Sequence, residues 1–471
     1  PYIEEYKQRA ANLPSSSLQR PEPPEATGRF GTVQQGMLKT GAGRYFQRTI
    51  YGTLTAAVQP GLSVDAEVDY GGSQGHTPED DADLSSSYDS FDGRLGLTSQ
   101  GTNLQIYGEL DGFYDAYVLY GARSQGFDPA AGPLPIEPNR NGAGAALSTG
   151  LQTSGIHSSH LEVSYGASRY ETGTETADST ETLFVDREKR ASVDALLNKT
   201  FGDFRLSTGG NFIVAGLDDN SVFDSDYFSY DAGLTGVWES GGGVDLELGA
   251  RILGYTADSD VGGELQYISP VARLTFRVSN QLQLYARNTP SVSMPGLTGL
   301  YEENPYLGRI SSFRPTIAAV DAEGGARIYR GSMQFAVWGG VREYPSYQYF
   351  QVENTAVAGF TRGFFDVGYE EARIIHAGGR ASLQLPDGVQ ASLELKFRQA
   401  RLTDDNIVIP YVSPATSNLS FAYPFAGRKG LLEVTGNIYG SRYVDLANDE
   451  RVGAYVDFDA GASYDFTDSF G

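Results

Sequence analysis

Along most of the chain, stretches of about ten residues alternate apolar and polar side chains, and Gly, Asp, Asn or Pro turns separate the stretches. In residues 62–70 the apolar positions are Leu62, Val64, Ala66, Val68 and Tyr70. The positions between them carry Ser63 or an acidic residue. Because successive side chains of a strand point to opposite sides, this pattern predicts strands with one apolar face and one acidic face.

A soluble sandwich and an outer-membrane barrel both accommodate such strands. We count about nineteen of them, and in a chain with 30 Tyr and 58 Gly this number favours the barrel, with lipid outside and a wet lumen inside. The predicted strands are residues 45–58, 62–70, 88–99, 104–120, 142–153, 160–170, 190–200, 204–214, 228–237, 244–255, 265–277, 282–288, 317–329, 333–344, 364–385, 389–402, 418–423, 431–442 and 454–466.

The lengths of the connections assign the two ends of this barrel. Short turns such as Pro60-Gly61 alternate with long polar loops such as residues 71–86. Outer-membrane barrels have short periplasmic turns and longer outer loops, so the short turns mark the periplasmic end. Residues 290–314 form the longest predicted loop. The fold class predicted is all-β, a large antiparallel transmembrane barrel of about 18–22 strands when complete.

Composition supports a membrane barrel over other classes. No run of 18 apolar residues is present, which excludes a transmembrane helix. The Tyr-rich composition suits membrane interfaces. The absence of Cys excludes thiolate catalysis. A net charge of −24 excludes nucleic-acid binding through phosphate neutralisation, and it is expected either to aid solubility or to disfavour anions in the lumen.

The two ends of the sequence depart from the repeat. Residues 1–40 are predicted to be a periplasmic or lumenal tail with a Ser/Pro linker at 13–24, and residues 41–471 the barrel. We expect a leader upstream of Pro1. The pattern stops abruptly after residue 466, so one to three closing strands are expected to be missing or supplied from elsewhere, since an open edge in lipid leaves backbone groups unpaired.

Two segments resemble the barrel domain of TonB-dependent outer-membrane receptors. In residues 284–327 the shared features are Arg287, Pro295, Asn304-Pro305-Tyr306-Leu307 and Glu323-Gly324. In residues 409–466 they are the stretches 410–414, 419–423, 439–443 and 455–466. The resemblance implies the receptors' barrel fold and a place in the bacterial outer membrane.

The plug domain of that family has no counterpart in this chain, because only about forty residues precede the first predicted strand. Residues 36–75 are instead similar to the start of plugless TonB-receptor-like barrels of Bacteroidota type. We therefore expect a conduit or scaffold whose lumen a periplasmic or lipid-anchored partner fills or gates. The alternatives are the barrel of a nutrient uptake receptor whose plug lies upstream or is lost, and a purely structural subunit of an outer-membrane complex.

Few residues are candidates for catalysis or metal binding, and we do not expect an enzyme. His157 and His160 are three apart, which puts them on opposite faces of a strand and makes a poor metal site; His160 beside Glu162 is half of a catalytic pair that nothing completes. Acidic loops are the better candidates for Ca²⁺, Mg²⁺ or bridging to lipopolysaccharide. Their residues are Glu79, Asp80, Asp81, Asp83, Asp218, Asp219, Asp224 and Asp226.

Overall fold

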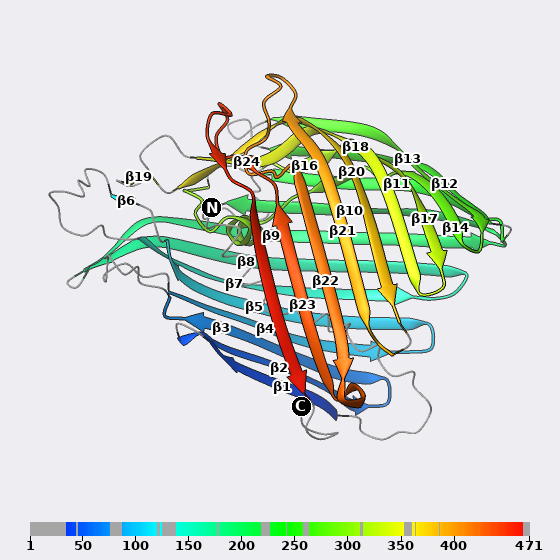
Figure 1. The fold of residues 1–471 in the computed structure, drawn as a ribbon, viewed down its shortest axis with the longest axis horizontal. Helices are drawn as coiled ribbons and strands as arrows, with labels where there is room; N and C mark the ends of the chain where they lie inside the picture. The colour runs from blue at the N-terminus through cyan, green and yellow to red at the C-terminus, as the bar shows by residue number, and fades with distance from the viewer. Residues whose placement is uncertain are drawn as a thin grey trace.

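The computed structural model describes a chain that is almost entirely antiparallel sheet (Figure 1). The described residues are 34–43, 46–75, 87–119, 123–124, 138–176, 179–217, 227–241, 243–257, 263–310, 314–352, 360–362, 364–385 and 387–464. Within them, no helix combines the length and the apolar character needed to cross a bilayer.

Among the described residues, twenty strands follow one another as a meander in which each strand pairs with the next one along the chain, from β1 to β26. They are β1 (Gln34–Ala42), β2 (Arg48–Gln59), β3 (Leu62–Ser73), β4 (Tyr88–Gln100), β5 (Leu104–Val118), β7 (Pro138–Thr153), β8 (His157–Thr176), β9 (Ser179–Phe201), β10 (Phe204–Leu217), β11 (Tyr227–Glu239), β12 (Val244–Ala257), β13 (Glu264–Ser279), β14 (Leu282–Asn288), β17 (Val320–Arg330), β18 (Met333–Val352), β20 (Phe365–Gln384), β21 (Gln390–Leu402), β22 (Ala415–Phe425), β23 (Gly430–Tyr439) and β26 (Tyr455–Tyr464).

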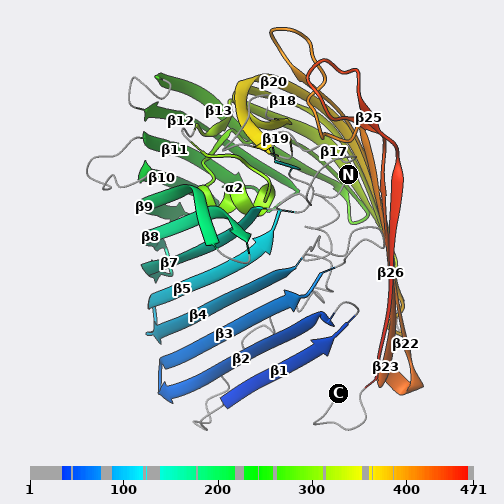
Figure 2. The ribbon, with the colours of Figure 1, turned by 90° about the vertical axis from the view of Figure 1, so that its left-hand side faces the viewer.

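Two short strands raise the sheet to 22 strands: β15 (Ser291–Ser293) pairs with β16 (Thr316–Ala318), which touches β18. The remaining elements are the helix α2 (Leu297–Glu303), the 3₁₀ turn η2 (Ala426–Arg428) and two small ladders, β6 (Arg123–Ser124) with β19 (Phe360–Arg362) and β24 (Arg442–Tyr443) with β25 (Arg451–Val452). The sheet curves round an interior in which α2 lies (Figure 2).

The two faces of the sheet differ as the alternation predicts. Apolar side chains of the outward face stand exposed along successive strands; Leu95, Leu110 and Leu147 are 51%, 50% and 57% exposed. The inward face carries the acidic set, in which Asp69 pairs in register with Asp92 of β4. Because each strand between β1 and β26 is bonded on both sides within the meander, the backbone behind this apolar surface is paired without water.

The short turns lie where predicted. Gly61, Gly202 and Gly331 adopt positive φ values of 79°, 60° and 58° in the connections after β2, β9 and β17, a conformation that costs glycine little. The long connections all fall at the opposite end of the strands. Short turns are periplasmic in outer-membrane barrels, so the long loops define the outer end.

Each of the nineteen predicted strands corresponds to one strand of the meander, with two differences in detail. The sheet begins earlier than predicted, because β1 lies partly within residues 1–40, where the alternation is weak. Residues 317–329 are not one strand: the chain breaks between β16 and β17, and only β17 belongs to the meander. Among the described residues no ladder joins β26 to β1, and the expectation about closing strands stays a prediction.

Candidate functional site in the lumen

The connection between β14 and β17 folds back into the interior of the sheet. Its helix α2 buries Leu297, Leu300 and Tyr301, which lie three and four residues apart and so share one face. This face packs on an apolar cluster of the inner wall that includes Tyr170 of β8 and Tyr227 of β11. The predicted loop 290–314 does connect two long strands, but it is not irregular throughout, because it contains β15 and α2. Its residues 290–310 form an inner layer, here called the in-folded segment.

Arg140 of β7 fastens the in-folded segment to the wall. Its side chain is fully buried. Nε donates to Thr172 Oγ1 of β8 at 2.8 Å, and the two terminal nitrogens donate to the carbonyls of Pro305 at 2.6 Å and Leu307 at 2.5 Å. The guanidinium also lies 4.1 Å from the ring centre of Tyr301. A planar fork that satisfies three acceptors explains why an arginine is tolerated at a buried position.

Glu188 of β9 makes the second attachment. Its carboxylate accepts from the Leu297 backbone N–H at 2.6 Å and from the Tyr227 hydroxyl at 2.5 Å. Gly296 precedes the helix and has no side chain to cap it, so Glu188 supplies an acceptor from the wall. Arg190, 4.0 Å from Glu188, donates to the Met294 carbonyl at 2.7 Å.

Tyr301 completes the attachment from the helix side. Its hydroxyl donates to Asp186 of β9. Burial, the largest cause, raises the pKa of the Tyr301 phenol well above its usual value. The phenol therefore remains a proton donor to the carboxylate throughout the physiological range.

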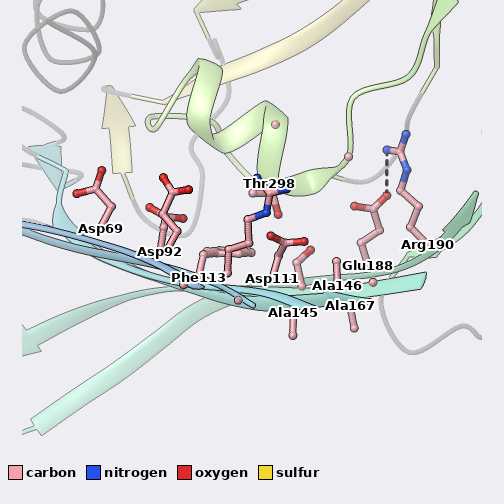
Figure 3. Close-up of a pocket in the computed structure, with 18 residues that line it drawn as sticks. Asp69, Asp92, Asp111, Phe113, Ala145, Ala146, Ala167, Glu188, Arg190 and Thr298 are labelled. Atoms are coloured by element: carbon pink, nitrogen blue, oxygen red, sulfur yellow. Dashed lines mark ion pairs between the residues drawn. The ribbon is translucent and has the colours of Figure 1, made fainter. Parts of the chain in front are cut away.

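A cavity of about 480 Å³ opens in the lumen beside α2 (Figure 3). Carboxylates dominate its charge, because five line it against two guanidinium groups. The carboxylates are Glu67, Asp69, Asp92, Asp111 and Glu188. In Figure 3 Asp69, Asp92 and Asp111 point to the side on which α2 lies, whereas Ala145 and Ala167 point away from it. The cavity is suited to attract cations and to repel anions.

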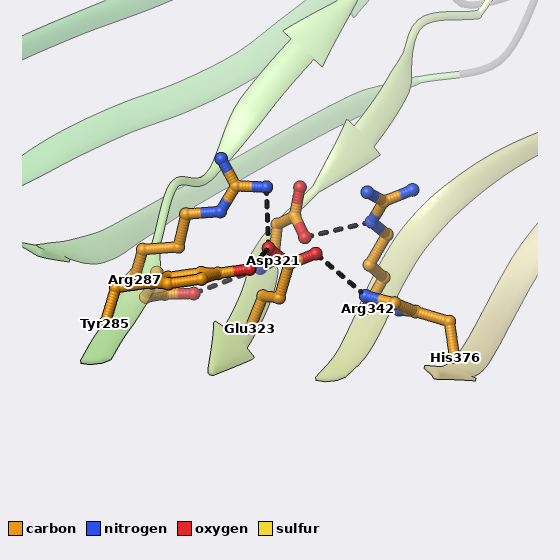
Figure 4. A network of polar contacts seen from close by, with 7 residues as sticks. Tyr285, Arg287, Asp321, Glu323, Arg342 and His376 are labelled. Carbon is orange, nitrogen blue, oxygen red and sulfur yellow. Dashed lines mark hydrogen bonds and ion pairs between the residues drawn. The ribbon is translucent and has the colours of Figure 1, made fainter. Parts of the chain in front are cut away.

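A second polar network lies on the inner wall across β14, β17, β18 and β20 (Figure 4). Glu323 is its centre: it accepts from the Tyr285 hydroxyl at 3.0 Å, lies 3.0 Å from Arg287 Nη2 and lies 3.3 Å from His376 Nε2. Beside it Arg342 Nε donates to Asp321 at 2.9 Å. These contacts cross-link neighbouring strands of the wall.

Some of the residues that carry the family resemblance take part in the wall network and in the attachment of the in-folded segment. Arg287 and Glu323 form an ion pair between neighbouring strands. Asn304 to Leu307 form the turn after α2, in which the Asn304 side chain accepts from the Tyr306 N–H at 3.0 Å. The carbonyls of Pro305 and Leu307 in this turn are the ones that Arg140 holds.

The predicted metal residues lie outside the described residues, at 76–86 and 218–226, and that hypothesis stays a prediction. In the part of the chain that the structure describes, no group of three or more His, Asp or Glu is placed to hold a metal ion. His157 and His160 face opposite sides of β8, as their spacing predicts. His160 stacks on Tyr107 with ring centres 6.4 Å apart and lies 3.6 Å from Asp194.

Sequence reasoning missed the attachments of the in-folded segment. Arg140 lies at the start of β7, four residues before Gly144, in a stretch without a distinctive motif. Its partners Pro305 and Leu307 are 165 and 167 residues away along the chain. The inward carboxylates Asp69 and Asp111, by contrast, follow from strand alternation alone.

Among the comparisons with known proteins, only the search of solved structures gives matches. No protein-family model matches the sequence. A search of curated proteins finds no match either. Solved structures do match: a mutant of the ferric enterobactin receptor PfeA from Pseudomonas aeruginosa is 13% identical with a TM-score of 0.69, over 93% of this chain and 74% of that chain.

Two further solved structures have the same fold. The siderophore receptor PirA from Acinetobacter baumannii is 12% identical with a TM-score of 0.67, and the iron transporter FrpB from Neisseria meningitidis is 10% identical with a TM-score of 0.69. Each match covers 93% of this chain and 75% of the other. The fold is therefore that of the TonB-receptor-like β-barrels, which confirms the predicted fold class.

Proposed function

We propose that the chain is the barrel of an outer-membrane conduit that favours cations and whose lumen is narrowed from the outer end by its own in-folded segment. One observation carries this proposal: the in-folded segment is fastened to the wall by Arg140 and Glu188, and the cavity left beside it is lined mainly by carboxylates. A wide polar lumen in a barrel of this size forms a channel unless something fills it.

The rest of the lumen is assigned to a partner subunit, periplasmic or lipid-anchored, as expected for a plugless barrel. The reason is physical, since an unfilled barrel of about twenty strands breaches the permeability barrier of the membrane. The matched structures favour a second candidate: receptors and transporters of iron complexes and metals share this barrel, so a plug encoded upstream would make the chain the barrel of an uptake receptor. Subunits that co-purify and the gene sequence upstream of Pro1 separate the two.

Planar bilayers test the conduit directly. We expect the purified chain to conduct, with a reversal potential in a KCl gradient that shows preference for K⁺ over Cl⁻. The double variant Asp69→Asn/Asp92→Asn is expected to lose much of this preference, because both carboxylates line the cavity. The matched control Asp203→Asn/Asp387→Asn removes two carboxylates from short turns and should leave the preference unchanged. A chain that conducts no ions when stripped of partners refutes the conduit.

A further inference from the structure

The helix α2 has two unlike sides. Leu297, Leu300 and Tyr301 form the side that packs on the apolar cluster of the inner wall. Successive residues of a helix are about 100° apart, so Thr298 and Gly299 fall on the opposite side. Both residues line the lumenal cavity. In Figure 3 Thr298 lies between the body of the helix and the labelled carboxylates of the cavity.

Neither the backbone nor the packing of α2 requires a glycine at position 299. Glycine destabilises a helix relative to alanine, and Gly299 is not one of the described glycines with positive φ. A Cβ atom at 299 would have its nearest side-chain neighbour outside the adjoining residues, the Pro295 Cβ, at 3.6 Å, which is an ordinary contact. At Gly296, by contrast, a Cβ atom would lie 2.8 Å from Glu188 Oε2. A side chain at 299 would extend into the cavity, which Gly299 lines.

Carboxylates dominate the wall of the cavity that faces α2. Asp69, Asp92 and Asp111 belong to β3, β4 and β5 and point to the side on which the helix lies (Figure 3). Asp69 and Asp92 are direct partners on neighbouring strands, and like charges in this position repel each other. A cation between the wall and α2 offsets this repulsion. The space that a side chain at 299 would occupy is therefore next to the place where a cation is stabilised.

Neither side of the cavity can widen without breaking contacts. The wall is a continuous ladder of strands, in which β3 pairs with β4 and β4 with β5. Arg140 and Glu188 hold the in-folded segment, and six of its apolar side chains are buried in one cluster with the wall. These are Met294, Leu297, Leu300, Tyr301, Leu307 and Ile310. The width of the cavity therefore depends on the side chains that line it.

We propose that Gly299 determines the largest cation that the conduit admits. The selectivity of a pore depends on its diameter and on the charges that line it. With no side chain at 299, the cavity of about 480 Å³ has room for small organic ammonium ions as well as for hydrated inorganic cations, and the carboxylates repel anions of the same size. This inference rests on the proposed conduit and adds to it the residue that limits the size of its substrates.

Planar bilayers with an organic cation test the assignment. The probes are K⁺ and tetraethylammonium, and the variants are Gly299→Gln, which places a long uncharged side chain in the cavity, and Gly299→Ala. For Gly299→Gln we expect the permeability of tetraethylammonium relative to K⁺ to fall about tenfold or more, because the passage is narrower. Gly299→Ala adds a single methyl group and should resemble the parent chain. Alanine and glutamine are both good helix formers, so neither variant weakens α2.

The matched control is Gly453→Gln. Gly453 lies between β25 and β26, where an added Cβ atom would meet nothing within 4 Å, so the same side chain is placed outside the cavity and the permeability ratio should stay that of the parent. Chymotrypsin, whose sites at Leu300 and Tyr301 are buried, shows whether α2 remains docked. Faster cleavage in Gly299→Gln would mean that position 299 has no free space beside it, and this overturns the assignment.

The bilayer results separate the assignment from the conduit. If the parent chain conducts and Gly299→Gln passes tetraethylammonium equally well, the assignment is wrong and the conduit stands. The assignment is also wrong if Gly299→Ala excludes tetraethylammonium as strongly as Gly299→Gln. A parent chain that conducts no ions overturns the conduit, and with it the size limit at Gly299.

Thiol labelling of the detergent-solubilised chain tests the geometry without conduction. The chain has no cysteine, so Gly299→Cys carries a single thiol. Its rates with a cationic and an anionic methanethiosulfonate reagent are each divided by the rate for Gly453→Cys. We expect this ratio to be about tenfold higher for the cationic reagent, and the preference to shrink when Asp69→Asn/Asp92→Asn is added. A thiol at 299 that does not react, or that reacts without charge preference, contradicts its placement beside the carboxylates.

Discussion

Replacing Arg140 by methionine removes the main attachment of the in-folded segment while keeping much of the side-chain volume. Three hydrogen bonds from a buried charged group are lost, each worth about 1.5–3 kcal/mol, and two carbonyls of the segment lose their donor. Since such terms do not add and methionine recovers some burial, we expect the docked state of the segment to lose roughly 3–5 kcal/mol.

Chymotrypsin reports this loss, because its sites at Leu300 and Tyr301 are buried in the parent chain. When opening is fast relative to cleavage, the rate follows the open population. A loss of about 3 kcal/mol then raises cleavage roughly 100-fold or more. Arg140→Lys keeps the positive charge but lacks the planar guanidinium, so we expect a cleavage rate between those of the parent chain and Arg140→Met.

The matched control is Arg273→Met. Arg273 is a cation of β13 on the same wall that lies 3.5 Å from Glu247 and has a half-exposed side chain. Its removal should leave cleavage at Tyr301 unchanged. The reasoning fails if Arg140→Met and the parent chain are cut at the same rate, because the segment would then be held by something other than this arginine.

Three further outcomes are expected. Glu188→Gln weakens the acceptor for the Leu297 N–H, so chymotrypsin should cut faster than in the parent chain but more slowly than in Arg140→Met; no change would show that Glu188 does not hold the helix. Burial raises the pKa of the Tyr411 phenol, in the outer loop after β21, to about 12 from 10.0. The folded chain thus keeps a proton that the unfolded chain loses, so this stabilisation is complete below pH 10 and is lost between pH 10 and 12. Urea unfolding in this window should be less pH-dependent for Tyr411→Phe, and equal slopes would contradict the assignment. Removal of Ca²⁺ with EDTA should lower the Tm of the parent chain, and Asn variants of the acidic loops should abolish the effect; a Tm that does not respond to EDTA refutes the metal hypothesis. The loop residues are Glu79, Asp80, Asp81, Asp83, Asp218, Asp219, Asp224 and Asp226.

The strands could be predicted because one face of each must contact an apolar medium. Residues 62–70 alternate strictly, and β3 follows them. β1 was missed because Gln34–Ala42 has small and polar residues on both faces and its apolar residues, Met37 and Leu38, are adjacent. The sequence predicts one strand over residues 317–329, because the break at Ala319 between β16 and β17 has no Gly or Pro to mark it.

Only part of the lumenal site could be predicted from the sequence. Alternation assigns Asp69 and Asp111 to the inner face, but it does not say that a loop will fold back over them. The contacts that hold that loop, from Arg140 to Leu307 and from Glu188 to Leu297, join residues more than a hundred positions apart. Such contacts depend on how the whole sheet curves round its interior, which no local sequence pattern specifies.

Spin labelling on β12 tests the central claim most directly, namely that lipid contacts one face of the sheet and water the other. The chain has no cysteine, so Leu248→Cys and Glu247→Cys give single labels on neighbouring residues of opposite faces. In reconstituted membranes the label at 248 should be relaxed by lipid-soluble oxygen and the label at 247 by a water-soluble nickel chelate. If the label at 248 is shielded from oxygen and the chain remains monodisperse without detergent, the apolar face is a protein core and the account is contradicted.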